Sequence, residues 1–351
     1  MVRRLVFLGI AVALVVLYGC GRAPTSPGSS TVPPAGGPSG TLTVTLLEDF
    51  SDRQVFPLTN WWNLDVSGAP VDALSDSILD FISGRTPQNP TAVRHLHPDF
   101  GPPPYGIPYV GVSGDQPLLP VTFTPYGSQS DPGAPGRPDG YPIPDLARTQ
   151  PDYIEGGVAG GGSSGDRHLL VIDRDHWLLF ETWATQWKTD HWQAGSGAVF
   201  DLASDARRPD GWTSADAAGL AIFPGLVRHD EVASANPIRH AFRVTTRATN
   251  GYVWPASHEA GSTVAAPPMG TRLRLKASKN LSGYTPEVQK IFQAMKTYGL
   301  IVADNGTDMY ISGTMDSLWD NDVLNPAFAS LSADDFEVIQ LGWGQPTTGI
   351  P

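Results

Sequence analysis

The sequence predicts a mainly β fold of the α+β class, namely an antiparallel β-sandwich or jelly-roll-like domain with one or two packed helices. Three observations predict it. Short apolar or alternating runs, separated by turn residues, dominate from residue 165 onward. Only one segment carries a complete set of helix signals, and the chain has no internal repeat. Hydrophobic residues make up 40% of the 351 residues and 10 are tryptophans, enough for a substantial core.

The strand predictions begin with a hairpin. Residues 168–173 and 176–187 are apolar runs on either side of Arg174 and Asp175, which are suited to a turn. Further runs of the same kind predict strands at residues 198–202, 239–247, 251–255 and 271–278. In the last of these the residues alternate strictly, so Leu273 and Leu275 are expected to face a core. The opposite face carries cations that form either a solvated surface or the wall of a cleft: Arg272, Arg274 and Lys276.

A second hairpin is predicted near the C-terminus. Asn305-Gly306 is the strongest two-residue hairpin signal in the chain, because both residues tolerate positive φ. It lies between two short apolar runs, 300–303 and 309–311. We expect these two runs to pair directly.

One helix is clearly marked. Thr285 suits the N-cap, Pro286 the first helical position and Glu287 the positive end of the helix, and Gly299 can close the C-terminus in a left-handed conformation. One face of this helix is predicted to be buried through Val288, Ile291, Phe292 and Met295. A weaker helix is predicted at 71–82. Its apolar positions are Leu74, Ile78 and Ile82.

Residues 101–152 are crowded with proline and glycine. Such a segment is expected to form neither strand nor helix, and to run as an extended belt or a mobile loop. As a belt it could form the rim of a site, with Tyr105 and Tyr109 as contacts.

The N-terminus predicts export and lipid attachment. Arg3 and Arg4 precede an apolar run, residues 5–17, that leads to Cys20, the only cysteine. This ending resembles a bacterial lipobox, in which the cysteine becomes the acylated N-terminus. The alternative is a membrane-spanning helix, which needs about 20 apolar residues. With Cys20 acylated, a disulfide, a cysteine-based zinc site and a thiol nucleophile are excluded.

The predicted domain organisation follows from the position of Cys20. Residues 1–19 are a lipoprotein signal peptide, 20–40 are the lipidated cysteine with a Gly/Pro/Ser-rich tether, and 41–351 are a single β-rich domain. The predicted location is exported and lipid-anchored to the bacterial membrane. Gly21, in place of an aspartate after the cysteine, favours the outer membrane or cell surface if the cell is Gram-negative.

Charge and motifs exclude several function classes. The formal net charge is −12, or about −14 once Arg3 and Arg4 leave with the signal, and no basic run is present. Nucleic acid is therefore not an expected partner. The sequence lacks a GxSxG elbow, an HExxH motif, a P-loop and a GxGxxG after a strand, so we expect no metal and no cofactor. Residues 304–308 lack the closing glutamate of a calcium loop.

Five segments form a recognisable series. In chain order they are GWTSADAAG, PGLVRHDEV, IRHAFR, YVWPASHEAG and YGLIVADNG. The series resembles an uncharacterised family of secreted bacterial proteins and lipoproteins, and the resemblance covers roughly residues 60–342. It implies secretion and a single domain. It implies no reaction and no catalytic residue.

Three titratable residues within these segments are candidate catalytic groups. Glu231 follows Asp230, and such a like-charge pair can raise one pKa for acid catalysis. His240 lies within a predicted strand, where it is either a core residue or a base facing a cleft. His258 follows an aromatic residue and a rigid turn. The alternative for Glu231 is an exposed loop pair.

Four further residues are candidate ligand contacts: Trp212, Arg243, Trp254 and Lys276. Aromatic rings can stack on sugars, and cations can neutralise acidic sugars. The alternative for the tryptophans is that they fill the core. Local structure accounts for two nearby acids, since Asp216 follows Thr213 at capping-box spacing and Asp304 precedes a turn.

Together these features predict an extracytoplasmic lipoprotein that acts on or binds polysaccharide, either as a glycoside hydrolase or as a polysaccharide lyase. A hydrolase needs two carboxyl groups about 5–10 Å apart, whereas a lyase needs a base and a cation. The alternative is a non-catalytic lipoprotein that binds glycan or has a structural role in the cell envelope. The expected partners are polysaccharide or envelope glycan, and the membrane through the lipid anchor.

Overall fold

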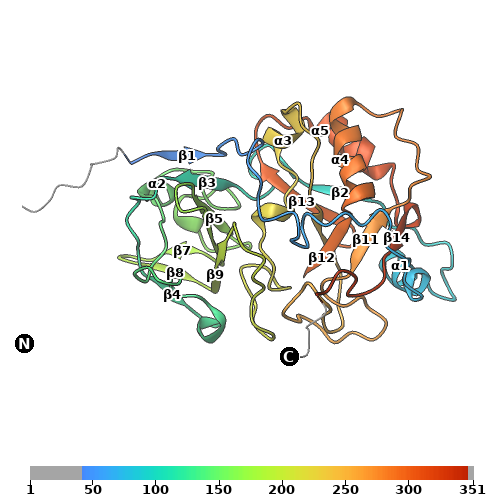
Figure 1. Ribbon diagram of the computed structural model, residues 1–351, viewed down its shortest axis with the longest axis horizontal. Coiled ribbons are helices and arrows are strands. Elements are labelled where there is room, and N and C mark those ends of the chain that lie inside the picture. Colours follow the sequence, from blue (N-terminus) through green and yellow to red (C-terminus); the bar gives the residue numbers. More distant parts are fainter. Residues whose placement is uncertain (1–41, 347–351) are drawn as a thin grey trace, which may run out of the picture. The chain divides into compact units, whose positions relative to one another are not determined.

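Three mixed β-sheets organise the chain (Figure 1). A computed structural model describes residues 42–346, with 24% of the chain in strands and 17% in helices. The fold is therefore mixed α/β. Within the described residues neither a closed barrel nor a clear sandwich is identified, and five α-helices are present where one or two were predicted.

The first sheet has five strands and is buried on both faces. Its order is β1(Val44–Leu46), β3(Tyr109–Val112), β5(Leu169–Asp173), β6(Leu178–Trp183) and β9(Ser196–Asp201). Strands β5 and β6 form the predicted antiparallel hairpin. Along β5, Leu170 and Ile172 face the largest hydrophobic core, whereas Leu169 and Val171 face a second core on the other side. Burial on both faces explains why this strand is apolar throughout.

The second sheet has six strands and carries the candidate site described below. Its order is β14(Phe336–Val338), β11(Arg272–Leu275), β12(Leu300–Asn305), β10(Phe242–Thr246), β13(Tyr310–Met315) and β2(His97–Gly101). Strand β10 is parallel to β12, and β13 is parallel to β2. The prediction of an antiparallel fold is therefore wrong for these pairs. Parallel neighbours require long connections, and the residues between β2 and β13 include four of the five strands of the first sheet.

The hairpin predicted at Asn305-Gly306 does not form, although both of its strands do. Strand β10 lies between β12 and β13 and pairs with each of them. A tight two-residue turn needs positive φ at both central residues. Positive φ is found instead at Met309, where φ is 63°. The connection is therefore wide enough to admit a third strand.

The other strand predictions have mixed outcomes. β9, β10 and β11 lie at or within predicted runs. Residues 251–255 form no strand, because Gly251 has a φ of 67° and Tyr252 makes a single bridge to Met269. Leu273 and Leu275 are fully buried, as predicted.

The cationic face of β11 is neither a solvated surface nor a cleft wall. Arg272 donates to the carbonyl of Trp61, and Arg274 forms an ion pair of 2.7 Å with Glu337. Both arginines are at most 8% exposed. Backbone carbonyls from the segment that precedes the first helix therefore cover this face of the strand.

A third, three-stranded sheet completes the β structure. Its order is β4(Val121–Phe123), β8(Trp192–Ala194) and β7(Gln186–Trp187). β4, together with β3 and a short helix, lies inside the Pro/Gly-rich segment 101–152, so the prediction that this segment contains no strand or helix is wrong. Tyr109 is 2% exposed and belongs to the core, whereas Tyr105 is exposed.

The helices include the one that was clearly predicted. Their bounds are α1(Ser75–Ser83), α2(Asp145–Thr149), α3(His229–Ala233), α4(Pro286–Thr297) and α5(Asn321–Ala329), with 3-10 turns η1(Gly127–Gln129), η2(Ala159–Gly161), η3(Phe223–Gly225) and η4(Ala333–Asp335). In α4 the side chain of Thr285 accepts from the Val288 amide. The four predicted apolar side chains of α4 are buried, and the helix packs along β11 (Figure 1). Gly299 has a φ of 77° after the helix, as predicted.

The predicted signal peptide and tether lie outside the described residues, and so does Cys20. The described residues belong to one compact unit, Thr41–Pro351. In residues 42–346, the helices are all too short or too polar to cross a bilayer.

Candidate functional site

Two adjoining cavities are lined by several charged side chains. Their volumes are about 280 Å³ and 180 Å³, and both are lined by Asp166, Asp304 and Asn305. We call the pair the acidic cleft, the larger cavity its first chamber and the smaller its second chamber. The three shared residues mark where the chambers meet.

The floor of the first chamber is one face of the six-stranded sheet. Side chains alternate between the two faces of a strand, so Arg243 and Thr245 of β10 point to the same side. In the register of the sheet, Thr245 lies beside Tyr310 of β13, and Ser312 of β13 lies beside Asp99 of β2. All five residues line the chamber. The alternate residues of these strands belong to the hydrophobic core.

A β-bulge brings Asp304 to this floor. Val244 of β10 pairs with Val302 of β12, but the next residue, Thr245, pairs with Asp304, so Ala303 is the extra residue. Without the bulge Thr245 would pair with Ala303, and the carboxyl group of Asp304 would face the core side. The bulge therefore places a carboxyl group beside Arg243 and Thr245.

The opposite wall comes from the segments that lead into β5. There the buried His168 pairs with the partly buried Glu155, with 2.7 Å between Nδ1 and the carboxylate, and Nε2 lies 3.1 Å from the Ala215 carbonyl. Both partners are acceptors, so both ring nitrogens donate. Burial alone would lower the pKa of His168, but the charge and hydrogen bond of Glu155 raise it to about 9. Burial likewise opposes ionisation of Glu155, yet His168 lowers its pKa.

The second cation of the cleft is also held by a carboxylate. Arg243 donates through Nη2 to Asp216 at 2.5 Å and through Nη1 to Ser312 at 2.7 Å. Asp304 lies 3.8 Å from the same Nη2. Burial raises the pKa of Asp216 to about 6 and outweighs the opposite effect of Arg243.

Two carboxyl groups of the first chamber have raised pKa values. Burial is the main cause at Asp304, and the opposing charge of Arg243 only partly offsets it. Asp99 keeps an exposed surface, but neighbouring protein atoms displace part of the water around its carboxyl group, and this desolvation raises its pKa. The negative charge of Glu155 adds to the effect. Asp166 contributes to both shifts through its own negative charge.

The second chamber has an aromatic wall and a histidine. Trp183 donates from Nε1 to Asp166 at 3.2 Å and packs edge-on against Tyr126. His258 donates from Nδ1 to the Ala217 carbonyl at 2.8 Å. In the neutral ring this bond fixes the tautomer in which Nε2 carries a lone pair. His258, predicted as catalytic, therefore lies in the same chamber as Asp166 and Asp304.

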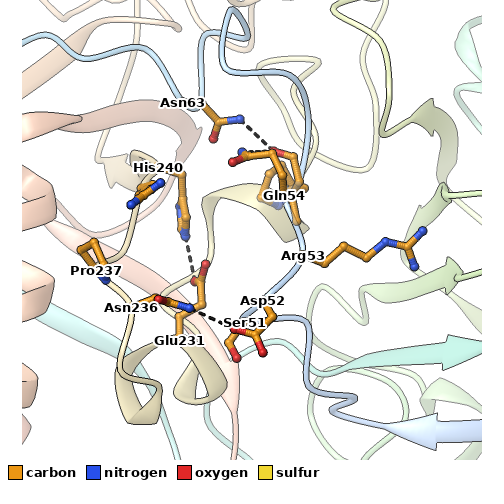
Figure 2. Close-up of a pocket in the computed structure, with 12 residues that line it drawn as sticks. Ser51, Asp52, Arg53, Gln54, Asn63, Glu231, Asn236, Pro237 and His240 are labelled. Atoms are coloured by element: carbon orange, nitrogen blue, oxygen red, sulfur yellow. Dashed lines mark hydrogen bonds and ion pairs between the residues drawn. The ribbon is translucent and has the colours of Figure 1, made fainter.

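The other predicted catalytic residues lie in a different cavity, of about 220 Å³ (Figure 2). Glu231 of α3 and Nε2 of His240 are 2.8 Å apart, and Nδ1 of His240 lies 2.9 Å from the Ala241 carbonyl. Arg228 approaches the other oxygen of Glu231 at 3.0 Å. Figure 2 shows the Glu231–His240 pair facing a loop whose Arg53 points away from it.

The expected elevation of the Glu231 pKa is wrong. Burial would raise this pKa, but the positive charges of Arg228 and His240 lower it. Glu231 is therefore held ionised beside the guanidinium of Arg228, and Asp230 turns its own carboxylate toward the Phe50 amide, at 2.9 Å. These contacts tie α3 to the segments around it.

The predicted ligand contacts are divided. Arg243 lines the acidic cleft, whereas the other three line neither the cleft nor the cavity of Figure 2. Trp212 lies near the guanidinium of Arg208, Trp254 packs edge-on against Trp61, and Lys276 donates to a backbone carbonyl.

Several cleft residues were missed or assigned to local structure. Asp216 does not act as a cap through its side chain, because that side chain binds Arg243. Asp304 lies within β12, one residue before its end, rather than opening a tight turn. The missed members are Asp99, Glu155, Asp166 and His168. The one available signal was Asp166 and His168, two polar residues placed immediately before a buried strand.

Among the described residues no group of three or more His, Cys, Asp or Glu side chains is arranged to hold a metal ion. The chain matches no protein-family model, and no curated protein or solved structure shows significant similarity to it.

Proposed function

We propose that the protein is a glycoside hydrolase of the cell envelope and that the acidic cleft is its active site. The observation that carries this proposal is the position of Asp166 and Asp304 at the junction of two chambers. A glycan cut within its chain needs room for sugars on both sides of the bond. The two chambers offer that room, and hydrolysis needs two carboxyl groups flanking the bond.

The two carboxyl groups differ in a way that suits different roles. Asp304 is the proposed general acid, because its raised pKa keeps its proton to a higher pH. It would give that proton to the glycosidic oxygen as the bond to the anomeric carbon breaks. Asp166 is the proposed second carboxylate, which either attacks the anomeric carbon or takes a proton from the attacking water.

The charge of the cleft favours hydrolysis over a lyase reaction. A lyase acting on uronic acids needs a cation to neutralise the sugar carboxylate. Both cations of the cleft are already paired, Arg243 with Asp216 and His168 with Glu155. The remaining carboxylates would repel a uronate.

Aromatic side chains support a sugar ligand. Trp183 and Tyr126 line the second chamber beside Asp166, and an aromatic face provides an apolar surface for a sugar ring.

We propose in addition that Cys20 anchors the exported protein through lipid. Replacing Cys20 by Ser tests the anchor, and the proposal fails if the variant is processed normally and stays on the membrane.

The test of activity compares two amide substitutions in the full-length protein solubilised in detergent. Asp304→Asn replaces the proposed acid by an amide of nearly the same size. Glu231→Gln makes the same kind of change in the cavity of Figure 2 and is the matched control. Reducing ends released from a panel of neutral and charged glycans are measured by mass spectrometry. We expect product from the parent and the control, and almost none from Asp304→Asn.

Binding to a glycan without product in any form of the protein would reject hydrolysis and support a non-catalytic glycan-binding lipoprotein. An equal loss of released product in Asp304→Asn and Glu231→Gln would show that the acidic cleft has no special role in hydrolysis.

A further inference from the structure

The two cations of the acidic cleft cannot balance its remaining acids. Arg243 is 3% exposed and His168 is 3% exposed, and each is engaged by a buried or partly buried carboxylate. Their positive charges are therefore cancelled inside the protein. A ligand in the first chamber meets the carboxylates that are left.

Three acidic side chains remain, and they make few contacts with the described residues. Asp99 has no hydrogen bond or ion pair through its side chain there, and Asp166 accepts only from Nε1 of Trp183. Asp304 accepts from the Asn305 amide at 2.7 Å and lies 3.8 Å from Arg243. The three acids line one chamber, and like charges that share a site resist joint ionisation unless a cation is added.

A second observation, independent of these three acids, points to a missing donor. One oxygen of Asp216 binds Arg243, but the other, Oδ2, has no partner among the described residues. The Asp216 side chain is fully buried and the residue lines the second chamber. A buried acceptor without a donor is costly, and a ligand N–H or O–H in the chamber would satisfy it.

The chemistry that fits is a sugar bearing a positive charge. An ammonium group supplies three donors and one positive charge, and the ring that carries it can lie against Trp183. We propose that the acidic cleft binds glycans that contain hexosamines with a free, non-acetylated amino group. This inference rests on the proposed function for cleavage, but binding tests it separately.

The experiment measures binding of three oligosaccharide series of equal length by isothermal titration calorimetry. They are oligomers of glucosamine, of N-acetylglucosamine and of glucose, added to the full-length protein in detergent. We expect the glucosamine oligomer to bind about tenfold or more tightly than the other two, because a charged hydrogen bond adds to the shared ring contacts. Its affinity alone should fall as salt is raised.

Two variants locate the effect. Asp99→Asn removes one exposed carboxylate of the cleft, and we expect it to weaken glucosamine binding about tenfold while leaving the neutral oligomers unchanged. Asp76→Asn, at another exposed position, on α1, is the matched control and should change nothing. Thermal unfolding of both variants checks that the fold is kept.

The outcomes separate this inference from the proposed hydrolysis. Equal or tighter binding of the acetylated or neutral series overturns the inference, even if those glycans are cleaved and the hydrolase stands. Preferential binding of glucosamine oligomers with no cleavage supports the inference and rejects the hydrolase. Absence of binding to all three series overturns the inference.

Discussion

The acidic cleft and the Glu231–His240 cavity contain the same kind of ion pair. His168 and Glu155 are 2.7 Å apart in the cleft, and His240 and Glu231 are 2.8 Å apart in the other cavity. They differ in what surrounds the pair. Glu231 has a further partner, the buried guanidinium of Arg228, and its pKa is lowered, whereas the cleft holds further acids beyond those paired with Arg243 and His168. We infer that the charge balance of a cavity, rather than one His–Glu pair, separates the proposed ligand site from a structural tie.

The largest expected effect of this difference is on activity. Asp304→Asn removes the proposed acid and should lower kcat by about 10²–10⁴-fold, whereas Glu231→Gln should change it by less than about threefold where the fold is kept. Initial rates on the best glycan of the panel measure both. A larger loss in Glu231→Gln at unchanged thermal stability would reverse the comparison.

The next effect is on stability and concerns the other cavity. Arg228 is 1% exposed and offsets both Asp230 and Glu231. Replacing it with Met leaves buried carboxylates without their partner, so the free energy of unfolding should fall by about 3–5 kcal/mol. Urea unfolding gives the value. A loss below about 1 kcal/mol would show that this network is not a structural tie.

A smaller effect depends on pH and belongs to the cleft. The pKa of His168 is raised from 6.5 to about 9, so the folded state binds its proton more tightly than the unfolded state does. The stabilisation is fully present below pH 6.5 and is lost as the pH rises to about 9. It amounts to about 3 kcal/mol.

His168→Gln should therefore flatten the decline in stability between pH 6.5 and 9, as measured by urea unfolding at each pH. Glu231→Gln, the matched control, should retain the decline, because the lowered pKa of Glu231 acts at acid pH. A decline that is unchanged in His168→Gln would contradict the assignment of a protonated ring.

The smallest effect is expected outside both cavities. Lys276 contacts only the Asp334 carbonyl through its amine, at 2.8 Å, among the described residues. Lys276→Ala should change the free energy of unfolding by no more than about 0.5 kcal/mol and should leave glycan binding unchanged. Weakened binding would restore Lys276 as the ligand contact that the sequence predicts.

Local signals predicted the elements whose structure is local. The β5–β6 hairpin and α4 are formed by consecutive residues, and their turn and capping residues are visible in the sequence. The parallel pairs were missed because strands such as β2 and β13 meet across most of the chain. Periodicity describes which face of a strand is apolar, but it does not say which strand lies beside it.

The cleft was missed for the same reason. Asp304 reaches it through a bulge that depends on pairing with β10, and Asp216 through a buried bond to Arg243. Each of these acids has an adequate local explanation in the sequence, as a turn or a cap. His258 was predicted because it follows an aromatic residue and a rigid turn, and Arg243 because a cation can neutralise an acidic sugar; a single sequence shows both features.

The order of strands in the six-stranded sheet also sets when the site can exist. Asp99 lies on β2, at one edge, and its only strand neighbour in the described residues is β13, which is synthesised after Asp304. At translation rates of about 5–20 residues per second, Asp304 emerges about 10–40 s after Asp99. No partial chain ending before β13 can hold both acids in place. A nascent or prematurely ended chain therefore lacks the complete floor of the cleft, which forms only when nearly all of the polypeptide is available to fold.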